Sequence, residues 1–536
     1  MKTPDYVYPW LAGKTGLPFL LFLIMLSGIV QFAAFAMSQQ YVISSMGAQP
    51  EDITFALQMT YVGILVTLPV HFRLIRYFEA RSYLIFAITL GIVLSIACVY
   101  TADLILFFIF RFLQGIVVCM ICGTMLMMLS LYLKPEYRQI AAPSIFYGTI
   151  LSSGVFIGLV FSQVALNQNW KEIYWYLIAF QVLSLVLILL IFNPRSGIRP
   201  YPLYQIDWAG SIFFLTAGLS LAYTLIYGSK YYWFSDPHIR FSSCLFILML
   251  LLFLFRAATV KRPLISISAF KYKKFWAGLI LLALYYGIKD SLNLVFGYTA
   301  GVLQWSPSQI MALGLVNVAG VFTFMFISGK LILKNKKIVP AVLIVGFAIL
   351  LFYHLWMYHI FTHDLSFGDL MLPVFLQGAA SGLIFVPIMI FTLTSLPPYT
   401  GMTGLIVAAY VRFVTVLNVG AGFYNLQLYY NQFFKERFLV HITSTGQMAG
   451  ERLAMLRQLF ISKGMSPAQA ESLANLNLSR SVAIQSQLLS NKAIFLSMSI
   501  AVAVILAVLI VSVCIAVIRL LREKRQTAGS LEAVAT

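Results

Sequence analysis

The chain has 536 residues, of which 61% are hydrophobic and 10% are charged, and its mean hydropathy is +0.90. A water-soluble protein of this length does not carry so large an apolar fraction, so the composition excludes a soluble globular fold and indicates an integral membrane protein. The formal net charge of +19 could suggest nucleic-acid binding, but its distribution along the chain indicates membrane topology instead.

Fourteen apolar stretches are long enough to cross a membrane as helices, which takes about 20 residues each. In chain order they cover residues 17–37, 53–70, 83–100, 104–133, 140–165, 173–193, 208–227, 241–258, 275–302, 307–333, 338–361, 369–395, 401–430 and 493–519. The first stretch ends in a sequence like a signal cleavage site, but its apolar run is too long for a signal peptide. The sequence therefore predicts an all-α integral membrane protein with 14 transmembrane helices.

Basic and acidic residues alternate between the loops. The basic ones fall on the cytoplasmic side if the chain starts there: Arg73, Arg76, Arg81, Lys134, Arg138, Arg195, Arg199, Arg256, Lys261, Arg262, Lys271, Lys273, Lys274, Lys330, Lys334, Lys336, Lys337, Arg519, Arg522, Lys524 and Arg525. The opposite loops carry the acids Glu51, Asp52, Asp103, Asp236, Asp364 and Asp369. Because cytoplasmic loops are enriched in lysine and arginine, we expect a multi-pass protein of the cell inner or plasma membrane with both termini cytoplasmic.

The sequence repeats itself in two places. "FLQG" occurs at 112–115 and at 375–378, and each time a proline follows 21 residues after the glutamine. The basic loops "RLIR" at 73–76 and "KLILK" at 330–334 form a second pair. A chance match is the alternative. A true repeat predicts two homologous helix bundles, an arrangement that transporters use to alternate access to a site at the membrane midplane.

We therefore expect an N-terminal six-helix bundle in residues 1–200, two additional helices in 201–260, and a C-terminal six-helix bundle in 261–536. The last part includes a long extracytoplasmic loop, 431–492, and a cytoplasmic tail, 520–536.

The long loop contains a helix-start signal in "SPAQAE", with Ser466 as the cap, Pro467 at the first helical position and Gln469 three residues after the cap. This pattern predicts helices, which we expect to be amphipathic and to lie over the pore mouth. They would either contact a periplasmic partner or form a simple lid.

Several ordered motifs resemble those of one transporter family. They are "RFLQG" at 111–115, "KPEYR" at 134–138, "NWKEIYWYL" at 169–177, "IDWAGSIFFLTAGLSLAYTLIYG" at 206–228, "RPLISISAFKYKKF" at 262–275 and "GMTGL" at 401–405 followed by Arg412. In this order and spacing the chain resembles the fourteen-helix branch of the major facilitator superfamily, the drug:proton antiporters of the EmrB/QacA type. The resemblance implies export of small molecules in exchange for protons and, in Gram-negative relatives, a periplasmic adaptor and an outer-membrane channel as partners.

The chain departs from the family pattern at three points. Ser27 stands where family members carry an acid in the first helix, and Val155 stands where the fifth helix has a proline after Gly154. The loop after the second helix keeps its basic residues but lacks the family's aspartate and glycine. The resemblance therefore supports transport more firmly than it supports proton antiport.

Four charged residues lie deep in the predicted spans: the cations Arg111, Lys289 and Arg412, and a single acid, Asp290. A charge at the bilayer centre costs about 2.5–3.5 kcal/mol on insertion scales, so we expect all four to face the bundle interior or water. Asp290 is the natural reversible proton carrier. The alternative is that Lys289 and Asp290 only neutralise each other.

The resemblance implies that Arg111 lies beside the cavity and takes part in proton coupling with Asp290; the alternative is a structural arginine. Besides Lys289 and Arg412, we expect Asn293 and Gln114 to line the substrate cavity, since Asn293 lies on the same helical face as Asp290. Three cations against one acid favour an anionic or neutral amphiphilic cargo.

Four glycines with small-xxx-small spacing, Gly154 and Gly158 and then Gly378 and Gly382, suggest close helix packing, with hinge action as the alternative. All five cysteines fall in predicted spans, so they indicate no disulfide framework. We expect no metal at His354, His359 and His363 because no carboxylate cluster supports them.

No phosphate-binding loop or nucleophile and base pair is recognisable, so we expect neither a cofactor nor an enzyme. The leading hypothesis is a secondary active transporter, a proton-coupled exporter of small amphiphilic compounds or drugs. The alternatives are a dedicated metabolite exporter, an uncoupled facilitator and, outside transport, a membrane-embedded sensor or enzyme.

Overall fold

The computed structural model describes residues 6–11, 16–133, 145, 148–150, 153, 155, 157–158, 171–194, 202–397, 400–443 and 446–535. Within these ranges the structure is helical, and its only β feature is an isolated bridge between Val7 and Phe192. Thirteen segments of the described residues, with 273–301 taken as one, are long and apolar enough to cross a membrane, which confirms the predicted all-α membrane fold; the count of 14 stays a prediction. The fifth predicted helix, 140–165, lies largely outside the described residues.

In the N-terminal part of the chain, the described residues form five membrane helices followed by a pair. The five are α1 (Leu17–Met46), α2 (Pro50–Phe78), α3 (Ala80–Tyr100), α4 (Leu104–Tyr132) and α6 (Glu172–Ile191). The pair is α7 (Trp208–Tyr227) and α8 (Pro237–Thr259). Loop acids fix helix starts, since Asp103 accepts a hydrogen bond from the Leu106 amide of α4 at 2.9 Å and Asp207 accepts one from the Gly210 amide of α7 at 3.0 Å.

Where it is described, the C-terminal part forms eight α-helices. They are α9 (Lys273–Lys289), α10 (Leu292–Gly301), α11 (Pro307–Lys334), α12 (Val339–Ile360), α13 (Phe367–Thr394), α14 (Gly401–His441), α15 (Gln447–Ser462) and α16 (Pro467–Ala535). The prediction of one continuous helix over 275–302 is wrong at its centre, because α9 ends at Lys289 and α10 begins at Leu292. Around this break the Ser291 amide donates to the Ile288 carbonyl, and the Leu294 amide to the Ser291 carbonyl, each at 3.1 Å. These tight turns replace the regular α-helical bonds.

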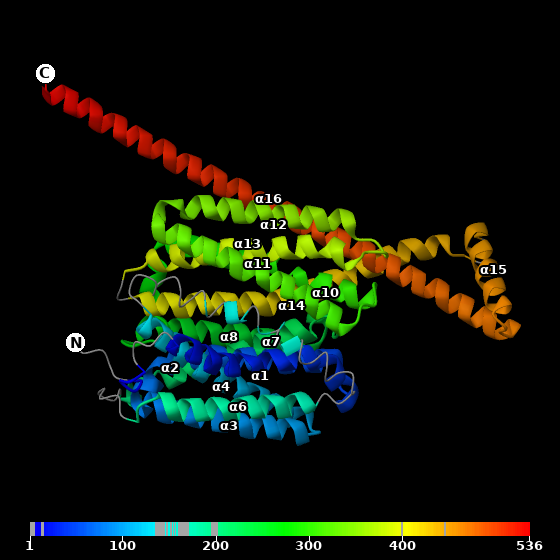
Figure 1. Ribbon diagram of the computed structural model, residues 1–536, viewed down its shortest axis with the longest axis horizontal. Coiled ribbons are helices and arrows are strands. Elements are labelled where there is room, and N and C mark those ends of the chain that lie inside the picture. The colour runs from blue at the N-terminus through cyan, green and yellow to red at the C-terminus, as the bar shows by residue number, and fades with distance from the viewer. Residues whose placement is uncertain are drawn as a thin grey trace.

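The helices gather into two groups (Figure 1). We call α1–α4 and α6 the first bundle, and α9–α14 with the membrane part of α16 the second bundle; each has its own apolar core. The pair α7 and α8 packs together, and α7 contacts both α2 and α14, so the pair lies where the bundles meet. The division of the chain predicted from the sequence, with boundaries at 200 and 260, stays a prediction.

The loop of the α7–α8 pair touches both bundles. The Tyr227 hydroxyl donates to Asp52 at the start of α2 at 2.5 Å, and Ser229 is hydrogen-bonded to Asn425 of α14. Lys230 donates to Gln49, next to Asp52. The pair therefore ties the two bundles together at one end.

Both bundles contain the same kind of tight helix crossing. In the first bundle a Cβ on Gly115 of α4 would overlap the Thr60 carbonyl oxygen of α2, and a Cβ on Gly63 of α2 would overlap the Phe112 carbonyl oxygen of α4. Only glycine allows two backbones to approach so closely.

In the second bundle a Cβ on Gly378 of α13 would overlap the Asn317 carbonyl oxygen of α11. Reciprocally, a Cβ on Gly320 would overlap the Phe375 carbonyl oxygen. Thr60 and Asn317 are corresponding positions in the repeat, because their separation in the sequence equals that between the starts of "RLIR" and "KLILK". The two sequence repeats thus coincide with a repeated helix crossing.

Residues 431–492, which we call the extension, continue the bundle helices rather than covering them (Figure 1). The expectation that this segment lies over the pore mouth is wrong: α14 runs on to His441, and α15 packs against the first part of α16 beyond the bundle. A turn at Gly464, with φ of +86°, reverses the chain between α15 and α16. The predicted start signal of α16 is confirmed, since the Gln469 amide donates to the Ser466 hydroxyl at 3.4 Å.

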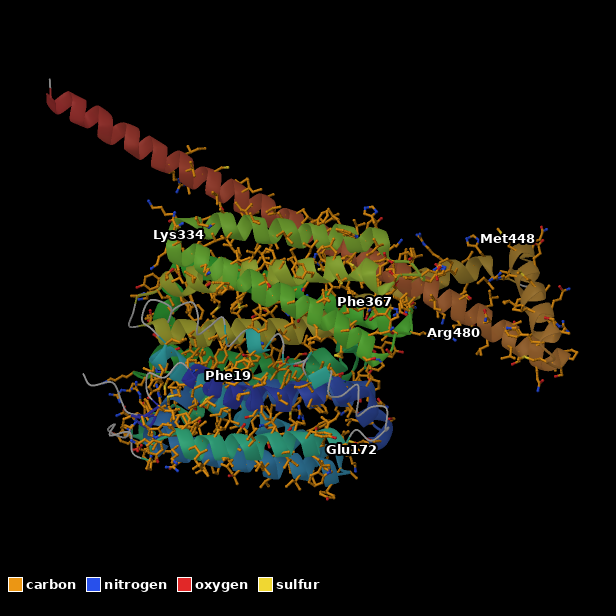
Figure 2. The ribbon with its side chains drawn as sticks, in the orientation of Figure 1. Phe19, Glu172, Lys334, Phe367, Met448 and Arg480 are labelled. Carbon is orange, nitrogen blue, oxygen red and sulfur yellow. The ribbon has the colours of Figure 1, made fainter. Side chains whose placement is uncertain are left out.

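The labelled residues identify the two ends of the bundle. Lys334 lies at the end opposite to Glu172, Phe367 and the extension (Figure 2). The C-terminal end of α16 lies on the same side as Lys334 (Figure 1).

Candidate functional site

A cavity of about 370 Å³ lies between the two bundles. Its described lining comes from α1, α2 and α4 on one side and from α9, α10, α11, α13 and α14 on the other. Ile150, Ser153 and Val155 also line it. Aromatic side chains from both bundles meet across it, as the rings of Tyr61 and Phe413 show with centroids 5.5 Å apart. The walls are thus mainly apolar, with few polar groups, as in small-molecule sites.

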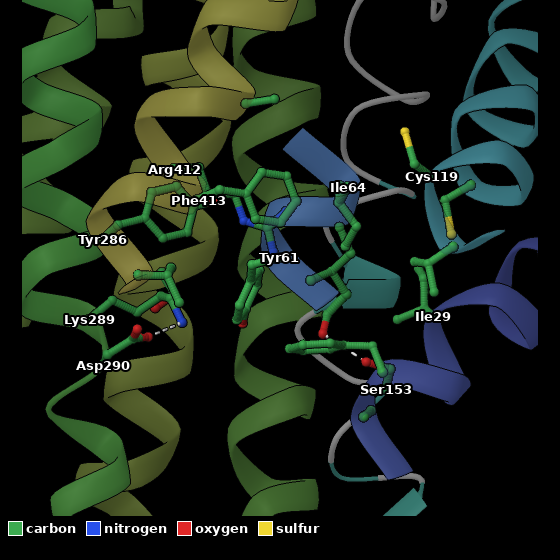
Figure 3. Close-up of a pocket in the computed structure, with 18 of the residues that line it drawn as sticks. Ile29, Tyr61, Ile64, Cys119, Ser153, Tyr286, Lys289, Asp290, Arg412 and Phe413 are labelled. Atoms are coloured by element: carbon green, nitrogen blue, oxygen red, sulfur yellow. Dashed lines mark hydrogen bonds and ion pairs between the residues drawn. The ribbon is translucent and has the colours of Figure 1, made fainter. Parts of the chain in front are cut away.

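Three charged residues contribute to this lining: Lys289, Asp290 and Arg412 (Figure 3). Lys289 Nζ lies 2.8 Å from Asp290 Oδ1, and their side chains are 16% and 15% exposed. The Arg412 guanidinium carbon lies 5.6 Å from the centre of the Tyr286 ring and 5.2 Å from that of Phe413. With all three ionised, the described lining carries one positive charge in excess.

Two polar side chains hold the break between α9 and α10. The Gln377 amide nitrogen of α13 donates to the Lys289 carbonyl at 3.1 Å. The Asn317 amide nitrogen of α11 donates to Gln377 Oε1 at 2.6 Å and to the Val374 carbonyl at 2.9 Å. Sequence reasoning used Gln377 only to mark the repeat and did not identify Asn317. Asn317 could have been found from the sequence, because it is the position that corresponds to Thr60 in the repeat.

The structure brings some of the predicted site residues together and separates others. Lys289, Asp290, Asn293 and Arg412 all line the cavity. Neither Arg111 nor Gln114 is among the described lining residues; they lie nearer the start of α4.

Arg111 is completely buried within the first bundle. Its Nη1 donates to Gln114, and its guanidinium carbon lies 3.9 Å from the centre of the Phe35 ring of α1. The Tyr174 hydroxyl of α6 is also close. The ion pairs formed among the described residues do not include Arg111. These contacts join three helices and favour the structural interpretation of this arginine.

Replacing Arg111 by methionine is expected to leave both folding and transport intact. Methionine can fill most of the same space, and it removes a charge that is buried without an ion-pair partner among the described residues, which is costly to keep in an apolar region. Arg111→Ala, by contrast, leaves a void and is expected to lose about 2–5 kcal/mol of stability. Thermal unfolding and export by both variants in vesicles provide the comparison. A folded Arg111→Met variant that does not transport would assign Arg111 to proton coupling instead.

The glycines selected from the sequence lie at close contacts where they are described. A Cβ on Gly378 would overlap the Asn317 carbonyl oxygen, and one on Gly382 would lie 2.5 Å from the Val321 carbonyl oxygen. A Cβ on Gly158 would overlap the Met311 side chain. Gly154 lies outside the described residues. The contacts at Gly378 and Gly382 favour packing over hinge action.

Comparison with known proteins agrees with this geometry. The profile of the Major Facilitator Superfamily matches residues 20–422. The chain is similar to the multidrug export protein EmrB of Escherichia coli K12, with 24% identity over 314 residues, 57% of this chain and 59% of that protein. It therefore spans less than two thirds of that relative's length. EmrB of Haemophilus influenzae is 24% identical over 371 residues, 67% of this chain and 69% of the relative.

Among solved structures, the chain is similar to a POT family transporter in complex with 5-aminolevulinic acid. The TM-score is 0.56 at 13% identity, covering 77% of this chain and 90% of that one. At this identity the similarity concerns the fold alone.

Proposed function

Because the chain belongs to the major facilitator superfamily and is therefore a membrane transporter rather than an enzyme, we propose that it exports small anionic or neutral amphiphilic compounds in exchange for protons. The observation that carries the proposal is the cavity between the bundles, whose aromatic walls enclose Lys289, Asp290 and Arg412. Relatives named as multidrug export proteins support the direction of transport and the broad class of cargo.

The charge of the cavity supports the proposed cargo class. Two cations and one carboxylate lie in the described lining, and Lys289 is already paired with Asp290. A cationic amphiphile would meet Arg412 without a second acid nearby in that lining, and an apolar cavity strengthens the repulsion. An anionic or neutral molecule with an aromatic part would instead stack on Tyr286 or Phe413 and approach Arg412.

Purified protein in vesicles with an imposed pH gradient tests the function. Three fluorescent amphiphiles of similar size, one anionic, one neutral and one cationic, would be offered in parallel. We expect gradient-driven accumulation of the first two. Downhill movement that is independent of the gradient would indicate an uncoupled facilitator, and accumulation of only one of the three compounds would indicate a dedicated exporter.

We further propose that the protein lies in the inner membrane with both termini in the cytoplasm. Reporters fused after Arg81, Lys274 or Lys337 are expected to report the cytoplasm, because these basic positions obey the charge rule for cytoplasmic loops. Reporters inserted between residues 446 and 480, within the extension, are expected to report the opposite side. A cytoplasmic signal from the extension would contradict this orientation.

An exposed apolar face on the extension supports the proposal that the protein binds a partner. Its α15 exposes Met448, Met455 and Leu459 along one face, while Ala449 and Leu456 are buried. We propose that this face contacts a periplasmic adaptor, itself joined to an outer-membrane channel. Photo-crosslinkers placed at Met455 in cells test this contact, with exposed Arg480 of α16 as the comparison position; equal crosslinking at both would contradict a specific contact at the α15 face.

A further inference from the structure

The Lys289–Asp290 pair sits where a membrane helix is interrupted, so the interruption itself needs support. In a regular helix the Asn293 amide would donate to the Lys289 carbonyl. Here the Asn293 amide donates to the Asp290 carbonyl instead, at 3.0 Å. The Lys289 carbonyl is therefore left without its helical donor in a largely apolar region, where an unpaired backbone group is unfavourable.

The missing donor comes from another helix. The Gln377 amide nitrogen reaches the Lys289 carbonyl, and Gln377 is itself 1% exposed. Its oxygen accepts from Asn317, whose amide nitrogen also donates to the Val374 carbonyl. Both atoms of the Gln377 amide are thus engaged, and its orientation is fixed by a residue on a third helix.

The tight crossing of α11 and α13 places this amide. Gln377 precedes Gly378, the glycine whose hydrogen faces the Asn317 carbonyl oxygen. The first bundle has the same crossing at Gly115, preceded by Gln114, but that glutamine accepts from Arg111 and does not line the cavity. The corresponding glutamines of the two bundles therefore have different partners, and of the two only Gln377 bonds to the interrupted helix.

We propose that Gln377 is a positioning residue for transport: oriented by Asn317, it supplies the hydrogen bond that keeps the α9–α10 break in place and so holds Lys289 and Asp290 together at the cavity wall. This role rests on the proposed function of Asp290. Gln377 does not exchange protons itself. It determines where the group that does so is held.

Three variants test the role. Gln377→Leu removes the donor, and Gln377→Glu supplies a donor only while its carboxyl is protonated. Gln181→Leu is the matched control, since Gln181 of α6 is also completely buried but neither of its amide atoms has a hydrogen-bond partner among the described residues. Amide hydrogen exchange of peptides covering 285–296 reports the break directly, and vesicle export reports its consequence.

We expect Gln377→Leu to speed exchange over 285–296 and to lower gradient-driven export by about tenfold, while Gln181→Leu stays within about twofold of the wild type. Gln377→Glu should match the wild type at low pH, where its carboxyl is protonated, and resemble Gln377→Leu at high pH, where it is ionised, each compared with the wild type at the same pH. A series from about pH 4 to about pH 9 spans the ordinary carboxyl pKa and the higher value that burial favours. The charged and hydroxyl groups that line the cavity here, Lys289, Asp290, Arg412, Tyr61 and Tyr286, are present in both proteins, so comparison at equal pH controls for them.

Unchanged exchange over 285–296 in Gln377→Leu would overturn the proposal, and so would a Gln377→Glu variant whose ratio to the wild type is independent of pH. If Gln377→Leu does not fold, the pH series on Gln377→Glu decides alone. The exchange measurement needs no proton gradient. A wild-type protein that shows no coupled export would therefore refute the proposed function while leaving the positioning result to stand or fall separately.

Discussion

Replacing Gly378 by alanine is expected to remove most of the folded protein from the membrane, and Gly115→Ala is expected to do the same. In each case the new methyl group would overlap a backbone carbonyl oxygen of the facing helix, Asn317 in one bundle and Thr60 in the other. A backbone atom cannot rotate away as a side chain can, so the helices would have to separate. Overpacking costs about 1–3 kcal/mol or more. The yield of monodisperse protein and the unfolding midpoint measure the effect.

Gly420→Ala is the matched control for these two variants. Gly420 lies within α14, and a Cβ there would have no atom within 4 Å. Alanine also favours helix over glycine, so this variant should fold at least as well as the wild type. Equal yields for Gly378→Ala and Gly420→Ala would show that the α11–α13 crossing is looser than the structure indicates.

These crossings also show how much of the fold the sequence could predict. The long apolar runs predicted the order of the membrane helices that the structure describes, because a membrane-spanning chain must satisfy its backbone hydrogen bonds within helices. Two short repeats located corresponding helices, and their glycines lie where the backbones touch. The sequence could not predict the break after Lys289, since the donor that stabilises it comes from Gln377, 88 residues later in the chain.

Only some of the cavity-lining residues could be predicted from the sequence. Charge and apolar context located Lys289, Asp290 and Arg412, which all line it. Arg111 is seven residues before Val118, a lining residue, and so lies on nearly the same face of α4. What separates it from the cavity is depth along the helix, where Phe35 and Tyr174 cover it. Periodicity indicates a face but not how far along that face a cavity extends.

The extension illustrates a different limit. Its helices and the start of α16 followed from local signals, including the cap at Ser466. Their direction did not, because it depends on α14 and α16 continuing unbroken beyond the bundle. Local sequence determines whether a helix continues; only packing determines what it covers.

Asp290→Asn is expected to abolish gradient-driven export while leaving downhill exchange of substrate measurable. Asparagine has nearly the shape of aspartate, so it can fill the same space beside Lys289, but it cannot take up and release a proton. Among the described lining residues Asp290 is the only carboxylate, so in this part of the protein no other acid can replace it. The measurement is accumulation of an anionic amphiphile in vesicles with and without a pH gradient, together with exchange at equal pH.

The interpretation of this result depends on Lys289, because the asparagine variant leaves that ammonium group without the carboxylate that lies 2.8 Å away in the wild type. Loss of transport could then reflect an unpaired buried charge rather than loss of a proton carrier. The double variant Lys289→Gln with Asp290→Asn removes both charges and separates the two explanations. If Asp290 couples transport to protons, the double variant regains folding and downhill exchange but still fails to accumulate substrate against its gradient. Full gradient-driven accumulation by the double variant would mean that the two residues only neutralise each other, and that protons, if they drive transport, follow another route.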